Sequence, residues 1–289
     1  MSTAVPAVAQ SLREAAVKAL SEGKAAVVVG YSPNGEAGAG AAAAFVRKPE
    51  DAERLVFDES CFANLAVYLT KDEIRKMGKI ALVVKGCDLR AVNVLLREHV
   101  IERANVILIG VRCGGVGKPV LDKCASCEMR EPQGCDVVVG DAPAKAAGNG
   151  KEKYAAVTEI EAKPMEQRWE FWQKELGKCI RCYACRQVCP LCYCKRCIVE
   201  KTTPQWVESS SHLRGNVAWN MARALHLTGR CVGCGECERV CPMHIPLGTL
   251  NRKMAKMVEE WYGFSSGMTP DEKAPFTAWS ADDPEPEIL

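Results

Sequence analysis

Two stretches of the C-terminal half decide the fold: Cys179-Ile-Arg-Cys182-Tyr-Ala-Cys185-Arg-Gln-Val-Cys189-Pro190 and Cys231-Val-Gly-Cys234-Gly-Glu-Cys237-Glu-Arg-Val-Cys241-Pro242. Both have the spacing C-x2-C-x2-C-x3-C-P, which is the run that holds 4Fe-4S clusters. Each cubane needs four thiolates. The first three cysteines of a run wrap one cluster, and the fourth, next to proline, usually reaches the other cluster. One such run would also fit zinc, but two identical runs, each closed by Cys-Pro, favour two 4Fe-4S clusters.

The composition sets the broad class of the protein. A chain of 289 residues suggests about two domains. The net charge of +2 does not point to nucleic acid or an anionic membrane as a partner. The N-terminal residues lack the basic and apolar regions of a secretory signal, and no apolar stretch is long enough to span a membrane. The 17 cysteines are therefore expected to be metal ligands in a reducing compartment, the cytoplasm.

The N-terminal half has the pattern of an α/β domain with a small, mainly parallel sheet. Short apolar runs separated by helical periodicity form a βαβ pattern at residues 79–111. Strands are expected at residues 24–30, 43–47, 79–85, 105–111 and 137–141. Helices are expected at residues 7–22, 61–77 and 88–99, and a small-residue helix is expected after a loop within 32–44.

The C-terminal half is expected to be a mainly α-helical dicluster ferredoxin domain. Residues 142–153 are small, polar and charged, and we interpret them as a linker. The predicted domains are residues 1–145 and 146–289. Helices are expected at residues 165–176, 216–227 and 247–262, followed by an extended surface tail from Gly263.

A long segment separates Cys189 of the first run from Cys231 of the second. This arrangement of the two runs resembles the helical ferredoxin domain of succinate dehydrogenase iron–sulfur subunits and of heterodisulfide reductase. The similarity covers residues 170–250 and includes Cys241-Pro-Met-His-Ile-Pro246. It implies two crossed ligand sets. One consists of Cys179, Cys182, Cys185 and Cys241, and the other of Cys231, Cys234, Cys237 and Cys189.

Three further cysteines follow the first run, at Cys192, Cys194 and Cys197. They either ligate an extra cluster or metal, or form a shell of thiols that tunes the neighbouring clusters. Three thiols cannot complete a cubane alone, and contacts to cluster sulfurs commonly set potentials, so we favour the shell. The four histidines are scattered and are interpreted as structural.

A second group of cysteines lies in the N-terminal half. Cys87 and Cys113 each follow a predicted strand, where parallel sheets usually bind ligands. A C-x2-C pair, Cys124 and Cys127, comes shortly after them. These residues are candidate ligands of a metal or cluster. Zinc remains open for this group, and Cys87 also fits a small buried core residue.

Residues 60–141 resemble the beta-subunit family of deazaflavin-reducing hydrogenases and formate dehydrogenases. The resemblance rests on Lys85-Gly-Cys87-Asp, Val111-Arg-Cys113-Gly-Gly, Cys124-Ala-Ser-Cys127 and Val137-Val-Val-Gly-Asp141. It implies a third 4Fe-4S cluster held by Cys87, Cys113, Cys124 and Cys127, with Cys61 and Cys135 as spare candidates, and also implies bound FAD. Residues 30–40 are rich in glycine but do not match a phosphate-binding G-x-G-x-x-G, so we interpret them as a plain loop.

These observations predict an iron–sulfur electron-transfer subunit of a cytoplasmic oxidoreductase complex. A catalytic or flavin-containing partner, such as a formate dehydrogenase, hydrogenase or heterodisulfide-reductase-like subunit, would carry out the substrate chemistry. Two alternatives stay open: a self-contained FAD-dependent oxidoreductase that reduces a deazaflavin or nicotinamide carrier, and a zinc-stabilised interaction module.

Overall fold

The structure of the chain, a computed structural model, describes residues 7–34, 40–141, 152–279 and 281. Its contacts divide the chain into two compact units. The first unit is Met1–Lys153 with Gly267–Asp271, and the second is Tyr154–Ser266 with Glu272–Leu289. Most of the predicted linker, residues 142–151, lies outside the described residues.

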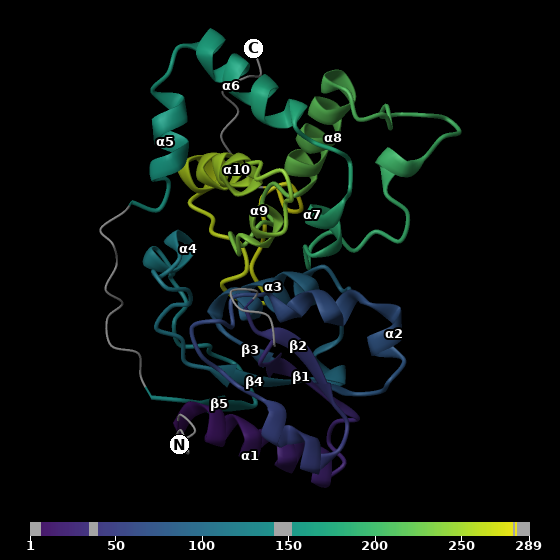
Figure 1. The fold of residues 1–289 in the computed structure, drawn as a ribbon, viewed down its shortest axis with the longest axis vertical. Helices are drawn as coiled ribbons and strands as arrows, with labels where there is room; N and C mark the ends of the chain where they lie inside the picture. Colours follow the sequence, from purple (N-terminus) through teal and green to yellow (C-terminus); the bar gives the residue numbers. More distant parts are fainter. Residues whose placement is uncertain (1–6, 35–39, 142–151, 280, 282–289) are drawn as a thin grey trace. The chain divides into compact units, whose positions relative to one another are not determined.

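The first unit is built on a five-stranded sheet with the strand order β2-β1-β3-β4-β5 (Figure 1). β1, β3, β4 and β5 run parallel, and β2 pairs antiparallel with β1 at one edge. All five residues of β3 are buried, as expected for a central strand of a parallel sheet. The strands are β1 (Val27–Ser32), β2 (Ala42–Val46), β3 (Ile80–Val84), β4 (Val106–Val111) and β5 (Val137–Val139).

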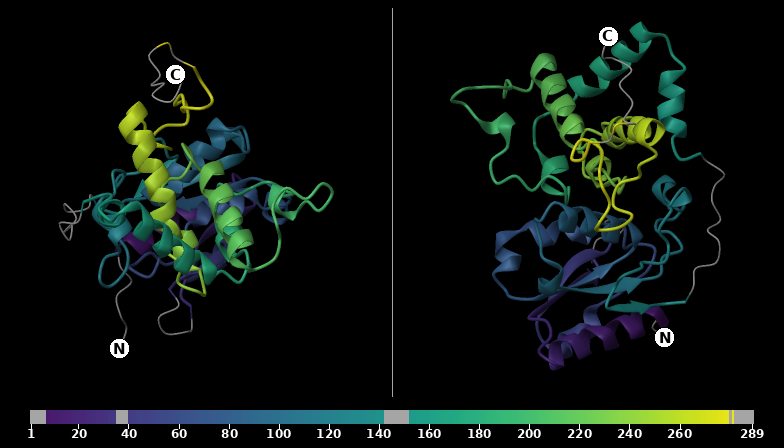
Figure 2. Two further views of the ribbon diagram at one scale, coloured as in Figure 1. Left: turned by 90° about the horizontal axis from the view of Figure 1, so that it is seen from above. Right: turned by 180° about the vertical axis from the view of Figure 1, so that it is seen from behind.

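Helices cover both faces of this sheet (Figures 1 and 2). The helix α1 (Ala7–Ser21) packs on β1, β4 and β5 through its buried alanines and Leu12. The helix α3 (Gly86–Arg97) and the 3-10 helix η2 (Leu65–Thr70) pack on β3 from the other side. The parallel α/β architecture predicted from the apolar runs is confirmed.

Two local predictions in this unit were wrong. Residues 61–77 do not form one helix: the chain is irregular at 61–64 and then forms η2 and the short α2 (Asp72–Arg75). The alanines expected to form a helix within 32–44 instead contribute to β2, because pairing with β1 outweighs the helix propensity of alanine. Residues 35–39 of the glycine-rich loop lie outside the described residues.

The second unit is helical. Its three longer helices are α6 (Met165–Gly177), α8 (Leu213–His226) and α10 (Leu247–Tyr262), close to the predicted bounds. α8 packs against both α6 and α10. Shorter elements are α5 (Ala155–Glu161), α7 (Ala184–Gln187), η4 (Ile198–Glu200) and α9 (Glu236–Arg239).

The core of this second unit contains cysteines as well as apolar side chains. Cys185, Cys237 and Cys241 are buried together with Leu176, Val199, Trp219, Ile245 and Leu247. None of the described helices is long and apolar enough to cross a membrane. The acidic end of the tail, residues 282–289, lies outside the described residues.

Candidate metal centres

The two cysteine runs of the second unit have the same backbone course. In the first run Arg181 and Tyr183 both have a left-handed φ of 59°. The equivalent positions of the second run are Gly233 and Gly235, with φ of 67° and 74°. A short helix then follows each loop, α7 in the first run and α9 in the second. Equivalent backbones at equivalent cysteines indicate that both loops are shaped to surround the same kind of group.

A left-handed backbone is unfavourable for residues other than glycine, so the first loop needs support. Arg181 supplies it by donating hydrogen bonds to the carbonyl oxygens of Gly215, at 2.8 Å, and Glu208, at 3.0 Å. Its guanidinium also lies over the rings of Tyr183 and Trp219, which themselves meet edge to face. This buried stack ties the loop to the start and middle of α8.

Four thiols from the two distant runs line one small cavity. They belong to Cys179, Cys182, Cys185 and Cys241. The other walls of the cavity are largely apolar and include Trp219, Ile245 and Leu247. Cys182 is exposed at its edge, whereas Cys185 and Cys241 are buried. The cavity thus combines three cysteines of the first run with the Cys-Pro cysteine of the second.

The Cys-Pro cysteine of the first run lies near the second run. Cys231 and Cys237 each interact electrostatically with Cys189, although Cys189 is far from them in the sequence. Cys234 lies between them in the same loop. From α10, the buried Asn251 donates a hydrogen bond to the sulfur of Cys237, with an Nδ2–Sγ distance of 3.5 Å. These contacts therefore connect the second run with the Cys-Pro cysteine of the first.

Burial dominates the acidity of these thiols. It raises the pKa of Cys185 to about 11 and that of Cys237 to about 12, and it also raises the pKa of Cys231. Iron binds thiolates, and a raised pKa opposes loss of the thiol proton, so burial works against cluster assembly at these cysteines.

The helix α8 supplies hydrogen-bond donors to the first run. Asn216 donates to the carbonyl oxygen of Cys179 at 2.8 Å, and Arg223 donates to that of Cys185 at 3.2 Å. Asn220 donates to the backbone of Asn216 and lines the thiol cavity. All three are buried, which the sequence did not reveal, because polar residues on a helix usually face solvent.

The three cysteines after the first run have different environments. The thiol of Cys189 is hydrogen-bonded to Cys192, which raises the pKa of Cys189 and lowers that of Cys192. Cys194 is exposed, and Cys197 is half-buried at the start of η4. Cys192 thus contacts a cysteine of the first run, and Cys197 packs against the core cluster that contains Cys185, Cys237 and Cys241.

In the first unit, the carboxyl ends of β3 and β4 lie at one edge of the sheet. Cys87 and Cys113 follow these two ends. Burial raises the pKa of Cys87 to about 12, and Cys113 adds to the rise. Burial likewise raises the pKa of Cys113, with Cys124 and Cys127 among the contributing neighbours. The structure therefore brings the four predicted cysteines of this unit near one another.

A glycine makes this approach possible. A Cβ at Gly86 would lie 1.6 Å from the carbonyl oxygen of Met129. Only glycine lets the segment after Cys127 pass so close to the start of α3, where Cys87 lies. The thiol of Cys127 also donates to the Met129 carbonyl, at 3.4 Å.

A buried ion pair fixes the turn that carries Cys87. Asp88 accepts hydrogen bonds from the backbone of Lys85, at 3.0 Å, and of Leu65, at 2.7 Å. The Lys85 ammonium lies 2.8 Å from Asp88 and donates to Tyr31 and to the Ala63 carbonyl, each at 2.5 Å. Lys85 and Asp88 are almost fully buried. Both charges act on Cys87: Lys85 lowers the pKa of its thiol, and Asp88 raises it.

The two spare candidates have other close neighbours. Cys61 is buried in a turn, where its sulfur contacts the Val56 carbonyl and Asp58. Cys135 packs over Gly110 of β4, and a Cβ at Gly110 would lie 2.9 Å from its sulfur. Burial raises the pKa of both thiols, to about 12 for Cys61 and about 11 for Cys135.

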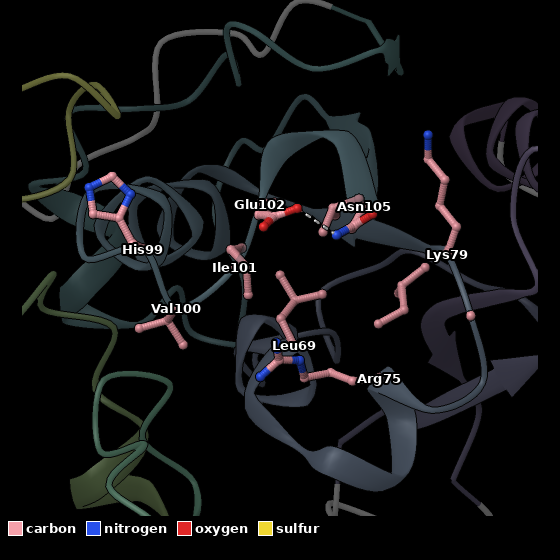
Figure 3. A pocket seen from close by; sticks show the side chains of 11 residues that line it. Leu69, Arg75, Lys79, His99, Val100, Ile101, Glu102 and Asn105 are labelled. Atoms are coloured by element: carbon pink, nitrogen blue, oxygen red, sulfur yellow. Dashed lines mark hydrogen bonds between the residues drawn. The ribbon is translucent and has the colours of Figure 1, made fainter.

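A separate cavity of about 430 Å³ lies near the amino ends of β3 and β4 (Figure 3). Its lining mixes Arg75, Lys79 and His99 with Glu102, which accepts a hydrogen bond from Asn105 at 3.1 Å. Cysteine is absent from this lining. It also lies at the edge opposite the carboxyl ends of the strands, where ligands of parallel sheets usually bind.

No three His, Cys, Asp or Glu side chains of the described residues converge as a single metal ion requires. A zinc ion would draw four ligand atoms to about 2.0–2.3 Å from one centre. The thiols of the first group line the walls of a small cavity.

Comparison with known proteins agrees with this geometry. A family model described as a 4Fe-4S dicluster domain matches residues 178–246, a range that contains all eight cysteines of the two runs. The second unit thus contains a 4Fe-4S dicluster domain, and the prediction of iron–sulfur clusters in this half is confirmed.

Two curated relatives resemble more of the chain. "F420-dependent formate dehydrogenase subunit beta" of Methanocaldococcus jannaschii is 23% identical in an alignment 283 positions long, and the match covers 66% of this chain and 74% of the relative. "F420-dependent formate dehydrogenase 1 subunit beta" of Methanococcus maripaludis is 24% identical in an alignment 327 positions long, and the match covers 80% of this chain and 83% of the relative. Both are subunits of oxidoreductases, in agreement with the resemblance found in the N-terminal half.

Proposed function

We propose that the chain is the iron–sulfur electron-transfer subunit of an oxidoreductase complex of the formate dehydrogenase type. The observation that carries the proposal is the cavity in which Cys241 joins Cys179, Cys182 and Cys185. Residues so distant in sequence gain nothing from sharing a thiol-lined cavity unless the thiols have a common ligand. A 4Fe-4S cluster is that ligand, and it carries one electron at a time.

The two ligand sets of the dicluster domain are crossed. Cys179, Cys182, Cys185 and Cys241 hold one cluster, and Cys231, Cys234, Cys237 and Cys189 hold the other. The electrostatic contacts of Cys189 with Cys231 and Cys237 support the second set. Cys192, Cys194 and Cys197 act as a thiol shell that tunes the clusters.

A third 4Fe-4S cluster is proposed for the first unit, held by Cys87, Cys113, Cys124 and Cys127. The mutual influence of these thiols at one sheet edge supports it, as does the close passage at Gly86. Bound FAD and exchange of electrons with a deazaflavin carrier are proposed from the names of the relatives and the resemblance alone.

Iron analysis tests the number of clusters. Anaerobically purified protein should contain iron and acid-labile sulfide near twelve per chain, on the basis of about four per cluster. A value near eight would remove the cluster of the first unit and leave its cysteines structural. Iron in the absence of labile sulfide, or zinc in its place, would contradict the proposal as a whole.

Replacement of each Cys-Pro cysteine by serine tests the crossed ligation. Cys241→Ser should damage the cluster of the first run, and Cys189→Ser should damage that of the second. Electron paramagnetic resonance of each variant, compared with variants of Cys182 and Cys234, identifies the surviving cluster. If each variant loses the cluster of its own run, the crossed assignment is wrong.

A further inference from the structure

The helix α8 connects the two candidate cluster sites through one buried cation. Its buried polar face consists of Asn216, Asn220 and Arg223, which recur at helical spacing. Asn216 and Asn220 form neutral hydrogen bonds. Arg223, only 5% exposed, brings a full charge into the core of the unit.

Arg223 faces cysteines of both proposed sets. One guanidinium nitrogen donates to the carbonyl of Cys185, at 3.2 Å, in the first set. The charge also acts on the thiols of Cys189 and Cys237 in the second set. It reaches Cys192 as well, whose pKa it helps to lower after the larger effect of the Cys189 hydrogen bond.

This cation has no carboxylate partner in the part of the chain that the structure describes. The ion pairs found there do not include Arg223, and its Nε atom is buried without a hydrogen-bond acceptor. The neighbouring buried arginine Arg186, by contrast, is paired with Glu200.

A buried charge without a counter-charge is strongly unfavourable. Among the described residues, the groups whose charge is seen to act on Arg223 are cysteines: Cys185, Cys189, Cys192 and Cys237. Cysteines are anionic when they bind iron as thiolates. A 4Fe-4S cluster with four thiolates is negative in both redox states and becomes more negative on reduction. The counter-charge of Arg223 is therefore the pair of clusters.

We propose that Arg223 is a positioning residue shared by the two clusters of the dicluster domain, which stabilises their reduced states and raises both midpoint potentials. This inference rests on the crossed two-cluster assignment proposed above. A positive charge near a cluster favours the more negative, reduced form, because net charge and hydrogen bonding are main determinants of cluster potential. Since the charge is hydrogen-bonded to the first set and acts electrostatically on the second, its removal should shift both potentials in the same direction.

The test is a redox titration of the full chain, followed by electron paramagnetic resonance, with iron and sulfide measured on the same samples. Arg223→Gln keeps a hydrogen-bond donor but removes the charge. We expect it to lower the ratio of reduced to oxidised cluster at a fixed potential at least tenfold for both clusters, a shift of about 59 mV for a one-electron couple. Arg223→Lys keeps the charge and should remain close to the wild type.

Arg214→Gln is the matched control. Arg214 lies on the same helix and is paired with Glu208 at 2.9 Å, but its side chain is 85% exposed. Its replacement removes one positive charge from a solvent-exposed position and should leave both midpoint potentials unchanged.

Four outcomes decide the proposal. Lowered midpoints of both clusters in Arg223→Gln, with Arg223→Lys near the wild type, support it. Loss of iron from Arg223→Gln but not from Arg223→Lys also supports it, because charge is then needed to hold the clusters. Full iron content with unchanged midpoints in Arg223→Gln overturns it. Equal loss of iron from both variants also overturns it, since shape rather than charge would then be required. Lack of iron in the wild-type protein would instead refute the proposed function.

Discussion

At the scale of single residues, the spacing of the two runs was sufficient to predict the eight cysteines of the dicluster domain. It could not predict the groups that surround them. Asn216, Arg223 and Asn251 lie within helices whose sequence shows no motif, and only the packing of α8 and α10 reveals that they face the cysteines. The cysteines of each run are close together in the sequence, whereas the polar side chains that contact them come from distant elements.

Asn251 illustrates this control for the second cluster. Its amide nitrogen donates to the Cys237 sulfur, and its amide oxygen is buried without a partner among the described residues. A hydrogen bond to a cluster sulfur stabilises the reduced state. We expect Asn251→Leu, a change of similar volume, to keep the iron and lower the midpoint potential of the second cluster.

The first cluster serves as the internal control in the same titration, because Asn251 is seen to contact Cys237 and not the first set. An equal shift of both potentials would indicate a general disturbance of the core. No shift in either would show that this hydrogen bond does not tune the cluster.

At the scale of elements, the apolar strands and the helices next to the cysteine runs could be predicted, because their burial leaves a clear hydrophobic pattern in the sequence. The residues 61–77 could not, since their shape is set by tertiary contacts. The Asn64 side chain accepts from the backbone of Ala66 and donates to the Cys87 carbonyl, and Asp88 accepts from Leu65. These contacts favour η2 over a continuous α-helix.

The close passage at Gly86 gives a test at this scale. Gly86→Ala would place a Cβ on the Met129 carbonyl and force the segment after Cys127 away from α3. Overpacking of this kind costs about 1–3 kcal/mol. We expect lower stability in denaturant titration and loss of about four iron atoms, the content of one cluster, from the first unit.

Gly177→Ala is the control for this substitution. Gly177 ends α6, and an added Cβ would meet only Leu213 at 3.8 Å, an ordinary contact. Alanine should stabilise the helix by up to about 0.5–1 kcal/mol without loss of iron. If Gly86→Ala retained the full iron content of the wild type, Cys87 and the Cys124–Cys127 pair would not share a cluster.

At the scale of the whole molecule, the two units differ in how their cores are built. The first unit has an ordinary apolar core around β3. The core of the second unit includes Cys185, Cys237 and Cys241, so its proposed cofactors are part of its packing. A unit whose core is organised around electron carriers is suited to transfer electrons rather than to transform a substrate.

The same contrast leads to the prediction that the chain works within a complex. We found no Ser–His–Asp or Cys–His arrangement in the sequence, and His212, the histidine that caps α8, is bound to Glu208 and to the backbone of Gly215. The two curated relatives are both beta subunits. The chain should therefore depend on a separate subunit for the oxidation of its substrate, and that subunit should reduce the clusters of this chain.

Mild anaerobic affinity purification from the native host tests this dependence. We expect a metal- or flavin-containing oxidoreductase subunit in near-stoichiometric amount, and we expect formate to bleach the visible absorption of the complex but not that of the isolated chain. A variant with Cys182→Ser, changed at the exposed edge of the first cluster, should keep the partner but slow the bleaching. The flavin content of the isolated chain distinguishes an electron-transfer subunit from a self-contained flavoenzyme. If the chain purified alone, with one flavin per chain and rapid turnover of a soluble carrier by a physiological donor, it would be a self-contained flavoenzyme and not a subunit.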